Sequence, residues 1–425
     1  MASRGRPGGA VERGPYRGPV PPARTSTPIF TRAFVLAFGS SLCFFLGIGM
    51  VIPVLPVYVT HQLGGNSLTV GIVVGIFSAS AVLARPASGH LGNRYGRRIV
   101  MVVGSAIVAV SLALYGAAPG ILVLVLLRLV TGVGEGAYFT GSSTLVADMA
   151  PPERRAQTLS YFSVALFTGL GVGPLLGQAM YRTHGPGVAF ALAGSWGVIG
   201  SLLATRVPDP PVPVHHEERP AHLFNRTAIG PGAVLTLGIM GITAFQAFTP
   251  LYVIRLHMAG PQYVFLTYSA VVLVTRIVAA SAADRAGVIP IASFATSAIV
   301  AGLGTMAAWG TPAGLYVGTA LFGVGIALQY PALLALVVNR AQPHERAAAI
   351  GTFTTSFDVA QGASGAVLGL VAAAGGYRAS FGAAAGFAVV GLVLLVARVG
   401  RSAPGATRAE QVLDDPDAWL PPGAD

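Results

Sequence analysis

The sequence predicts an all-α integral membrane protein of twelve transmembrane helices, arranged as two pseudo-symmetric six-helix bundles. Three observations predict this class: a low charge content, a series of long apolar runs, and an internal duplication. Of the 425 residues, 53% are hydrophobic and 10% are charged, and the mean hydropathy is +0.69. A soluble domain carries about 25% charged residues, so this composition indicates a chain in contact with lipid.

Apolar runs long enough to cross a bilayer, about 20 residues each, recur along the whole chain. The first run is too long for a cleaved signal sequence and follows a Pro-rich tail. The twelve expected spans are 33–59, 68–88, 99–118, 121–146, 158–181, 188–206, 228–254, 263–282, 289–308, 313–337, 348–373 and 380–398.

Arginine placement predicts the orientation of the chain in the membrane. All 26 basic residues are arginines; with the amino terminus inside, twenty fall in cytoplasmic segments and three, Arg182, Arg255 and Arg378, in outer ones. Cytoplasmic loops are enriched in basic residues, so we expect a multi-pass protein of the cell membrane with both termini in the cytoplasm. The net charge of +11 then reflects topology and contact with anionic membrane lipids. Nucleic-acid binding is not expected, because no basic patch is interleaved with aromatic residues.

The two halves of the chain repeat each other. Residues around 50–180 match those around 245–370 at an offset of 191 to 194, so that Arg85 falls on Arg276. Such repeats place a substrate site near the membrane midplane, between halves that move against each other. The predicted division is a disordered cytoplasmic tail over 1–30, an N-terminal bundle over 31–206, a central cytoplasmic loop over 207–227, a C-terminal bundle over 228–398 and a cytoplasmic tail over 399–425.

Two carboxylates, Glu135 and Asp358, lie near the middle of apolar runs, one in each half. A charged side chain at membrane depth costs about 2.5–3.5 kcal/mol even on lenient insertion scales, so such residues usually serve a function. We predict that they couple transport to protons, together with Arg128, which lies roughly 10 Å from Glu135 along the same helix. Arg128 could bias the ionisation of Glu135, hold an anionic substrate group, or form a structural salt bridge with Glu135.

Asp358 has no arginine near it on its own span. Without a cation from another helix it is expected to be largely protonated, either as a proton carrier or as a neutral, hydrogen-bonded structural group. Arg85 and Arg276 lie near the cytoplasmic ends of equivalent spans, and we expect them to extend to the interface rather than to contact substrate.

A mixed set of polar and aromatic side chains is expected to line the midplane cavity. Such a lining suits an amphipathic organic molecule better than a multiply charged one, although the aromatic residues could equally serve helix packing. The candidates are Phe44, Tyr138, Phe245, Gln246, Gln329, Tyr330 and Phe357.

Two motifs in the first half resemble those of the Major Facilitator Superfamily. The run from Gly89 to Arg98, GHLGNRYGRR, is similar to the family's signature loop after the second span. Arg128 with Gly132 and Gly134 resembles the family's Arg-x-x-x-Gly-x-Gly motif. The resemblance covers about residues 30 to 400 and implies the two-bundle transporter fold.

A third motif, in the fifth span, resembles the Gly-x-x-x-Gly-Pro-x-x-Gly motif most typical of the drug:proton antiporters of that family. It consists of Gly169, Gly173, Pro174 and Gly177. Small residues at this spacing let helices approach closely, and Pro174 permits a bend, so the segment could act as a hinge, as a packing surface or as both.

The signature loop is expected to form a cytoplasmic gate, as the resemblance implies; a static topological anchor is the alternative. The family usually has Asp where this chain has Asn93, so the latch could be weaker or be carried by Asp284. The expected gating residues are Gly89, Asn93, Arg94, Gly96, Arg97, Arg98, Asp284 and Arg285.

The energy source follows from residues that the sequence lacks. A nucleotide-binding phosphate loop needs a lysine, as does Schiff-base chemistry, and the chain has none. His-Glu-x-x-His and Gly-x-Ser-x-Gly motifs are also missing, so we expect neither an enzyme nor a cofactor or metal. The sequence therefore predicts a monomeric, proton-coupled secondary transporter that exports a small organic molecule. The alternatives are proton-coupled uptake of a small nutrient such as a sugar or organic acid, a membrane-embedded enzyme, and a non-transporting sensor or scaffold on a transporter fold.

Overall fold

The computed structural model describes residues 30–151, 154–209, 225–279, 286–342 and 345–399, and within these ranges the regular secondary structure is entirely helical. Its first half contains α1 (Arg32–His61), α2 (Ser67–Tyr95), α3 (Arg97–Leu114), the short 3₁₀ helix η1 (Tyr115–Ala117), α4 (Ile121–Met149) and α5 (Arg155–Thr205). Its second half contains α6 (Arg226–Arg255), α7 (Gln262–Val278), α9 (Val288–Ala308), α10 (Pro312–Arg340), α11 (Arg346–Leu394) and the π-helical turn η4 (Leu395–Val399).

Several helices begin at a polar capping residue. Thr31, Asn66 and Thr311 accept hydrogen bonds from backbone N–H groups in the first turns of α1, α2 and α10, at 3.0–3.2 Å. These side chains satisfy donors that have no partner within the helix, which fixes where the helix starts. The described part of the chain holds nine helices long and apolar enough to cross a membrane.

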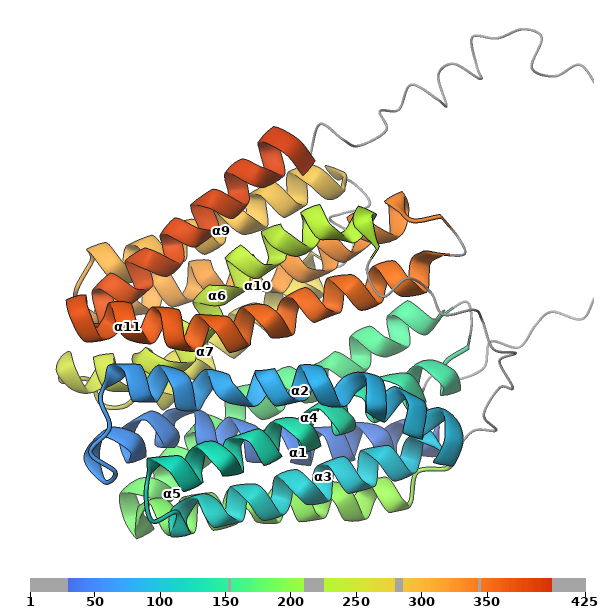
Figure 1. Cartoon of the computed structure of the whole chain (residues 1–425), viewed down its shortest axis with the longest axis horizontal. Coiled ribbons are helices and arrows are strands. Elements are labelled where there is room, and N and C mark those ends of the chain that lie inside the picture. Colours follow the sequence, from blue (N-terminus) through green and yellow to red (C-terminus); the bar gives the residue numbers. More distant parts are fainter. Residues whose placement is uncertain (1–29, 152–153, 210–224, 280–285, 343–344, 400–425) are drawn as a thin grey trace, which may run out of the picture.

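α5 and α11 each contain one sharp turn. A helix of 51 or 49 residues would extend about 75 Å, far beyond a hydrocarbon core of about 30 Å. Gly185 in α5 and Gly376 in α11 have φ of 81° and 79°, a backbone region that favours glycine, and Figure 1 shows α11 reversing its direction. The count of twelve spans stays a prediction, because it requires both arms of α5 and α11, and the 17-residue α7, to cross separately.

The two halves lie side by side, with the blue-to-green helices below and the yellow-to-red helices above in Figure 1. α1 packs on α5, and α2 and α3 pack on α4; in the second half α6 packs on α11 and α9 on α10. The backbone repeats as well, because Gly96 and Gly287, like Gly185 and Gly376, lie 191 residues apart and share positive φ. This repetition agrees with the predicted pseudo-symmetry.

The boundary between the halves is formed mainly by α2 against α11 and by α5 against α7. Below, "terminal end" means the end of the molecule at which α1 begins and α2 ends, and "distal end" means the opposite one, at which α1 ends and α2 begins. Toward the distal end α2 and α11 meet backbone to backbone: a Cβ added to Gly75 would lie 3.0 Å from the Gly365 Cα, and one added to Gly71 would run into the Gly365 carbonyl oxygen. Glycine at both surfaces therefore allows the halves to touch there.

Candidate functional site

An ion pair joins the two halves deeper in the boundary. Arg85 of α2 donates from Nη2 to Oδ1 of Asp358 of α11 at 2.9 Å, with side-chain exposures of 22% and 5%. The expectation that Arg85 extends to the membrane interface is therefore wrong. Asp358 was expected to be largely protonated if no cation from another helix lay beside it. Arg85, on a helix of the other half, is such a cation, so that condition does not hold.

Glu135 lies next to this pair. It is half-buried on α4, and Arg85, Arg128 and Asp358 all lie within electrostatic range of its carboxylate. One helical turn further along α4, the Phe139 ring lies 5.2 Å from the Arg85 guanidinium. Arg85 is thus held between a carboxylate and an aromatic ring of its own half and the carboxylate of the opposite half. Arg85 therefore acts on two acidic groups, one from each half.

Arg128 forms a different set of contacts from those the sequence suggested. Its Nε and Nη2 donate to the carbonyl oxygens of Val73 and Val74 on α2, both at 2.8 Å, and its guanidinium lies 4.4 Å from the Phe77 ring. Within the described ranges no carboxylate lies within 4.0 Å of it, so a salt bridge with Glu135 is not formed. Arg128 therefore connects α4 to α2 by hydrogen bonds. It acts on Glu135 only through longer-range electrostatic attraction.

On the other side of the boundary, Arg276 of α7 corresponds to Arg85. Its guanidinium lies 4.5 Å from the ring of Phe167, which belongs to α5 of the first half. Tyr330 of α10 lies between the two arginines, within electrostatic range of Arg85, Asp358 and Arg276. The central cluster is defined by Arg85, Glu135, Phe139, Phe167, Arg276, Tyr330 and Asp358.

The sequence predicts that Arg85 and Arg276 extend to the membrane interface rather than contact substrate, and it predicts no role for Phe167. One signal was present: an arginine recurs at the same position of two matching apolar runs, 191 residues apart. Guanidinium groups at membrane depth need partners, and intramembrane carboxylates are among the groups that provide them. The Phe167 contact could not be found in this way, because an aromatic residue in an apolar run carries no signal of its own.

The predicted cavity residues divide into two groups. Phe44, Tyr138, Phe245 and Gln329 are at most 1% exposed and contact their own half: Tyr138 stacks on Phe44 at 3.7 Å between ring centroids, and its hydroxyl pairs with Ser40 and Ser41. These four side chains are buried inside their own halves. Their cavity role stays a prediction, and packing, the alternative considered for the aromatic residues, accounts for their positions.

The remaining predicted cavity residues are partly exposed. Tyr330 and Phe357 are half-buried and meet edge to face at 6.1 Å beside Asp358, and Gln246 is half-buried on α6. Tyr330 belongs to the central cluster and Phe357 packs against it, so both are candidate substrate contacts, whereas among the described residues no contact joins Gln246 to the cluster. The two groups differ in the helix face on which they lie. Residues on one face of a span point into their own bundle, whereas residues on another face point toward the boundary between the halves.

The signature run from Gly89 to Arg98 lies at the terminal end, and the prediction that it forms a loop is wrong: α2 continues to Tyr95 and α3 begins at Arg97, so Gly96 alone separates the two helices. Arg97 forms an ion pair with Asp148 of α4 at 3.5 Å and also approaches the Gly89 carbonyl oxygen, while the backbone N–H of Arg98 faces Asp209. Asn93 and Arg94 are exposed. Asp284 and Arg285 lie outside the described residues, so the gating role predicted for these positions is untested. Asp148 and Asp209 are partners that the sequence did not indicate.

The fifth-span motif packs against α1. A Cβ added to Gly169 would lie 2.6 Å from the Phe45 Cβ, one added to Gly173 would lie 2.7 Å from the Gly49 Cα, and one added to Gly177 would run into the Met50 carbonyl oxygen. The motif thus holds α5 in backbone contact with α1. The hinge role predicted for these glycines and Pro174 stays a prediction.

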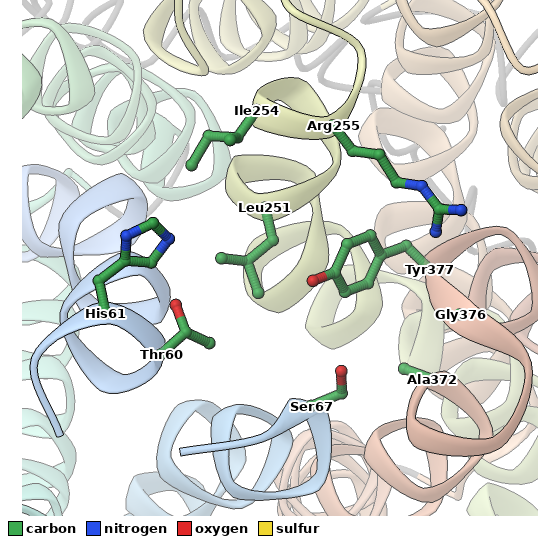
Figure 2. A pocket seen from close by; sticks show the side chains of 9 residues that line it. All are labelled: Thr60, His61, Ser67, Leu251, Ile254, Arg255, Ala372, Gly376 and Tyr377. Atoms are coloured by element: carbon green, nitrogen blue, oxygen red, sulfur yellow. The ribbon is translucent and has the colours of Figure 1, made fainter. Parts of the chain in front are cut away.

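A separate cavity of about 390 Å³ lies at the distal end between the halves (Figure 2). It is lined by both halves, and Tyr377 comes within hydrogen-bonding range of Ser67 across it. Neither Glu135 nor Asp358 lines this cavity. It is distinct from the central cluster, and its polar groups include Arg255 and His61 at the mouth.

Comparison with known proteins places the chain among transporters. The sequence profile of the Major Facilitator Superfamily matches residues 37–364 and 262–422. An uncharacterized MFS-type transporter of Salmonella typhimurium is 28% identical over 369 residues, covering 83% of this chain and 92% of the relative. One of Burkholderia pseudomallei is 28% identical over 359 residues, covering 82% and 88%.

Solved structures share the fold at low sequence identity. A POT family transporter in complex with a thioalcohol conjugated peptide aligns with a TM-score of 0.75 at 12% identity, covering 87% of this chain and 96% of that one. A point mutant of the nucleoside transporter NupG aligns at 0.73 and 15%, covering 86% and 99%, and the human organic anion transporter MFSD10 at 0.66 and 18%, also covering 86% and 99%. The profile match spans most of the chain, and the all-helical architecture agrees with it: this protein is a multi-pass membrane transporter that belongs to the Major Facilitator Superfamily.

Proposed function

We propose that the protein is a proton-coupled secondary active transporter that exports a small organic molecule by alternating access. The observation that carries the proposal is the Arg85–Asp358 ion pair across the boundary between the halves, with Glu135 beside it. Carboxylates at membrane depth are the groups that proton-driven carriers use. In this protein Glu135 and Asp358 also lie at the boundary along which the two halves must separate.

The proton step follows from the charges at that surface. While Asp358 is ionised, its attraction to Arg85 ties α11 to α2 and stabilises the present arrangement. Protonation of Asp358 removes the negative charge that Arg85 faces, and this weakens the connection between the halves. Glu135 is then the carboxylate that attracts Arg85. Both carboxylates thus act on Arg85, and a proton that moves from one to the other changes which carboxylate attracts the Arg85 guanidinium.

Direction and substrate are inferred more indirectly. Export rests on the fifth-span motif, which resembles that of drug:proton antiporters, and uptake of a small nutrient such as a sugar or organic acid is the second candidate. The partly exposed aromatic side chains of Tyr330 and Phe357 suit an organic molecule. The named substrates of the solved structures differ from one another, so they favour no single class.

We also propose that the protein lies in the cell membrane as a monomer with both termini in the cytoplasm. Twenty arginines on one predicted side against three on the other support this orientation. Under it, the terminal end of the molecule faces the cytoplasm and the distal end faces outward. The two halves that enclose the site are supplied by one chain, so no second copy is needed to complete it.

Transport in proteoliposomes tests the coupling. A substrate is first identified by its thermal stabilisation of the purified protein, and its flux is then measured under an imposed pH gradient. Glu135→Gln and Asp358→Asn are expected to lose gradient-driven flux at least tenfold while still exchanging substrate at equal pH, where no net proton movement is required. Wild-type flux of both variants under the gradient would overturn the coupling assignment. Substrate accumulation in intact cells separates export, which lowers it, from uptake.

A further inference from the structure

Arg276 is a second intramembrane cation, and its surroundings differ from those of Arg85. Both arginines occupy the same position of the repeat, 191 residues apart, and both reach across the boundary between the halves. Arg85 meets the carboxylate of Asp358. The residue 191 positions before Asp358 in the sequence is Phe167. The ring of Phe167 is the group that the Arg276 guanidinium contacts. The repeat therefore provides a counter-charge for one arginine and an aromatic ring for the other.

The charge on Arg276 is not compensated by the described part of the protein. Within those ranges no carboxylate lies within 4.0 Å of its guanidinium, and its buried Nε has no hydrogen-bond acceptor. The side chains of Tyr268 and Tyr330 lie within electrostatic range of Arg276.

A half-buried cation such as Arg276 is costly without a partner, because it gives up part of its hydration and receives little in return. The Phe167 ring recovers only part of this cost, because an aromatic face attracts a cation but carries no net counter-charge. An anionic ligand group would supply the missing counter-charge, and a guanidinium can bind a carboxylate through two parallel hydrogen bonds. The half-buried rings of Phe167, Tyr268, Tyr330 and Phe357 would contact an apolar body attached to that group.

We propose that Arg276 binds the anionic group of the transported substrate, and that the substrate is an organic anion with an aromatic or apolar body. This inference rests on the proposed function in one respect, namely that the ligand of the central cluster is the transport substrate. It does not depend on proton coupling or on direction. Binding at equilibrium, with no gradient, therefore tests it separately.

Three probes with one aromatic body and different charge isolate the role of Arg276. Binding of 2-naphthoate, 2-naphthamide and 2-naphthylmethylammonium to the purified full-length protein is measured by calorimetry and by thermal stabilisation. The naphthoate is expected to bind at least tenfold more tightly than the amide and the ammonium. Arg276→Gln is expected to abolish that preference, and Arg276→Lys to retain part of it, because lysine keeps the charge but not the planar pair of donors.

Arg255→Gln is the matched control, since Arg255 lines the distal cavity and not the central cluster. This variant is expected to keep the naphthoate preference. Loss of the preference in Arg255→Gln with retention in Arg276→Gln would move the anion site to the distal cavity and overturn the proposal. Equal binding of the three probes to the wild type would also overturn it. Stabilisation by inorganic phosphate or by phosphatidylglycerol micelles, without any by naphthoate, would indicate a phosphate or lipid headgroup instead of a substrate and would contradict it as well.

A measurement without ligand provides a second test. Removing an uncompensated half-buried charge should not weaken the protein, so Arg276→Gln is expected to melt at or above the wild-type temperature. Arg85→Gln, which leaves Asp358 without its cation, is expected to melt several degrees lower. A comparable loss in both variants would show that Arg276 has a stabilising protein partner, contrary to the proposal.

Discussion

Arg85 of α2 and Asp358 of α11 form an ion pair at 2.9 Å that joins the two halves of the transporter. The helices that carry them also touch through Gly71, Gly75 and Gly365 nearer the distal end. One helix pair therefore combines a contact that requires small residues with a contact that requires opposite charges. The first depends on shape alone, whereas the second depends on protonation.

The ion pair yields a prediction on stability. Arg85→Gln leaves an almost fully buried carboxylate without its partner, which should cost about 1–3 kcal/mol. The double variant Arg85→Gln/Asp358→Asn should lose less than Arg85→Gln alone, because no buried charge remains unpaired. Thermal unfolding of the four proteins in one detergent measures this. Purely additive losses would show that the two side chains do not interact.

Tyr138 tests whether a predicted cavity residue is a packing residue. Its hydroxyl pairs with Ser40 and Ser41 at 3.1 and 2.9 Å inside the first half. Tyr138→Phe should therefore destabilise the protein by about 1 kcal/mol, since it removes hydrogen bonds of two buried serines while keeping the stack on Phe44. Substrate affinity should change less than twofold. A large loss of affinity with unchanged stability would restore the cavity assignment.

The helices were predictable from the sequence because lipid constrains length and composition so strongly. The first expected span, 33–59, corresponds to α1 over Arg32–His61, and the expected gap between 181 and 188 contains the turn at Gly185. Every backbone polar group at membrane depth must be paired, so long apolar runs have few alternatives to helix. The duplication then indicated how the helices are grouped.

The partners of the charged side chains were not predictable in the same way. Asp358 pairs with Arg85, which is far away in the sequence and lies on a helix of the other half. Arg128 donates to backbone carbonyl oxygens of α2 and not to Glu135 on its own helix. Helical spacing shows which residues share a face but not which neighbouring helix that face meets. Side-chain pairing in this protein depends on the packing of whole helices.

The glycine contact between the halves leads to a conformational prediction. A Cβ on Gly365 would run into the Gly71 carbonyl oxygen, so Gly365→Ala should push α2 and α11 apart at the distal end. With buried Cys43 replaced by alanine, the labelling rate of Ser67→Cys in the distal cavity should rise several-fold in this variant. Gly386→Ala is the control, because a Cβ there meets nothing within 4 Å. Equal labelling rates in the two variants would show that the halves do not depend on this contact.

The glycines before α3 and α9 separate backbone strain from steric conflict. Gly96 and Gly287 occupy equivalent positions with φ of 98° and 82°, so alanine at either should cost about 1–2 kcal/mol. A Cβ on Gly96 would also run into the Asp209 carboxylate, which faces the backbone N–H of Arg98, whereas a Cβ on Gly287 would lie 3.8 Å from its nearest neighbour.

Gly96→Ala should therefore destabilise the protein more than Gly287→Ala does. Gly89→Ala, in the same signature run but inside α2 and with open space around the added methyl group, should have no more than a small effect. Denaturation of the three variants under identical conditions gives the order. Equal losses for Gly96→Ala and Gly287→Ala would mean that the junction of α2 and α3 depends on backbone conformation alone, and that Asp209 moves aside without cost.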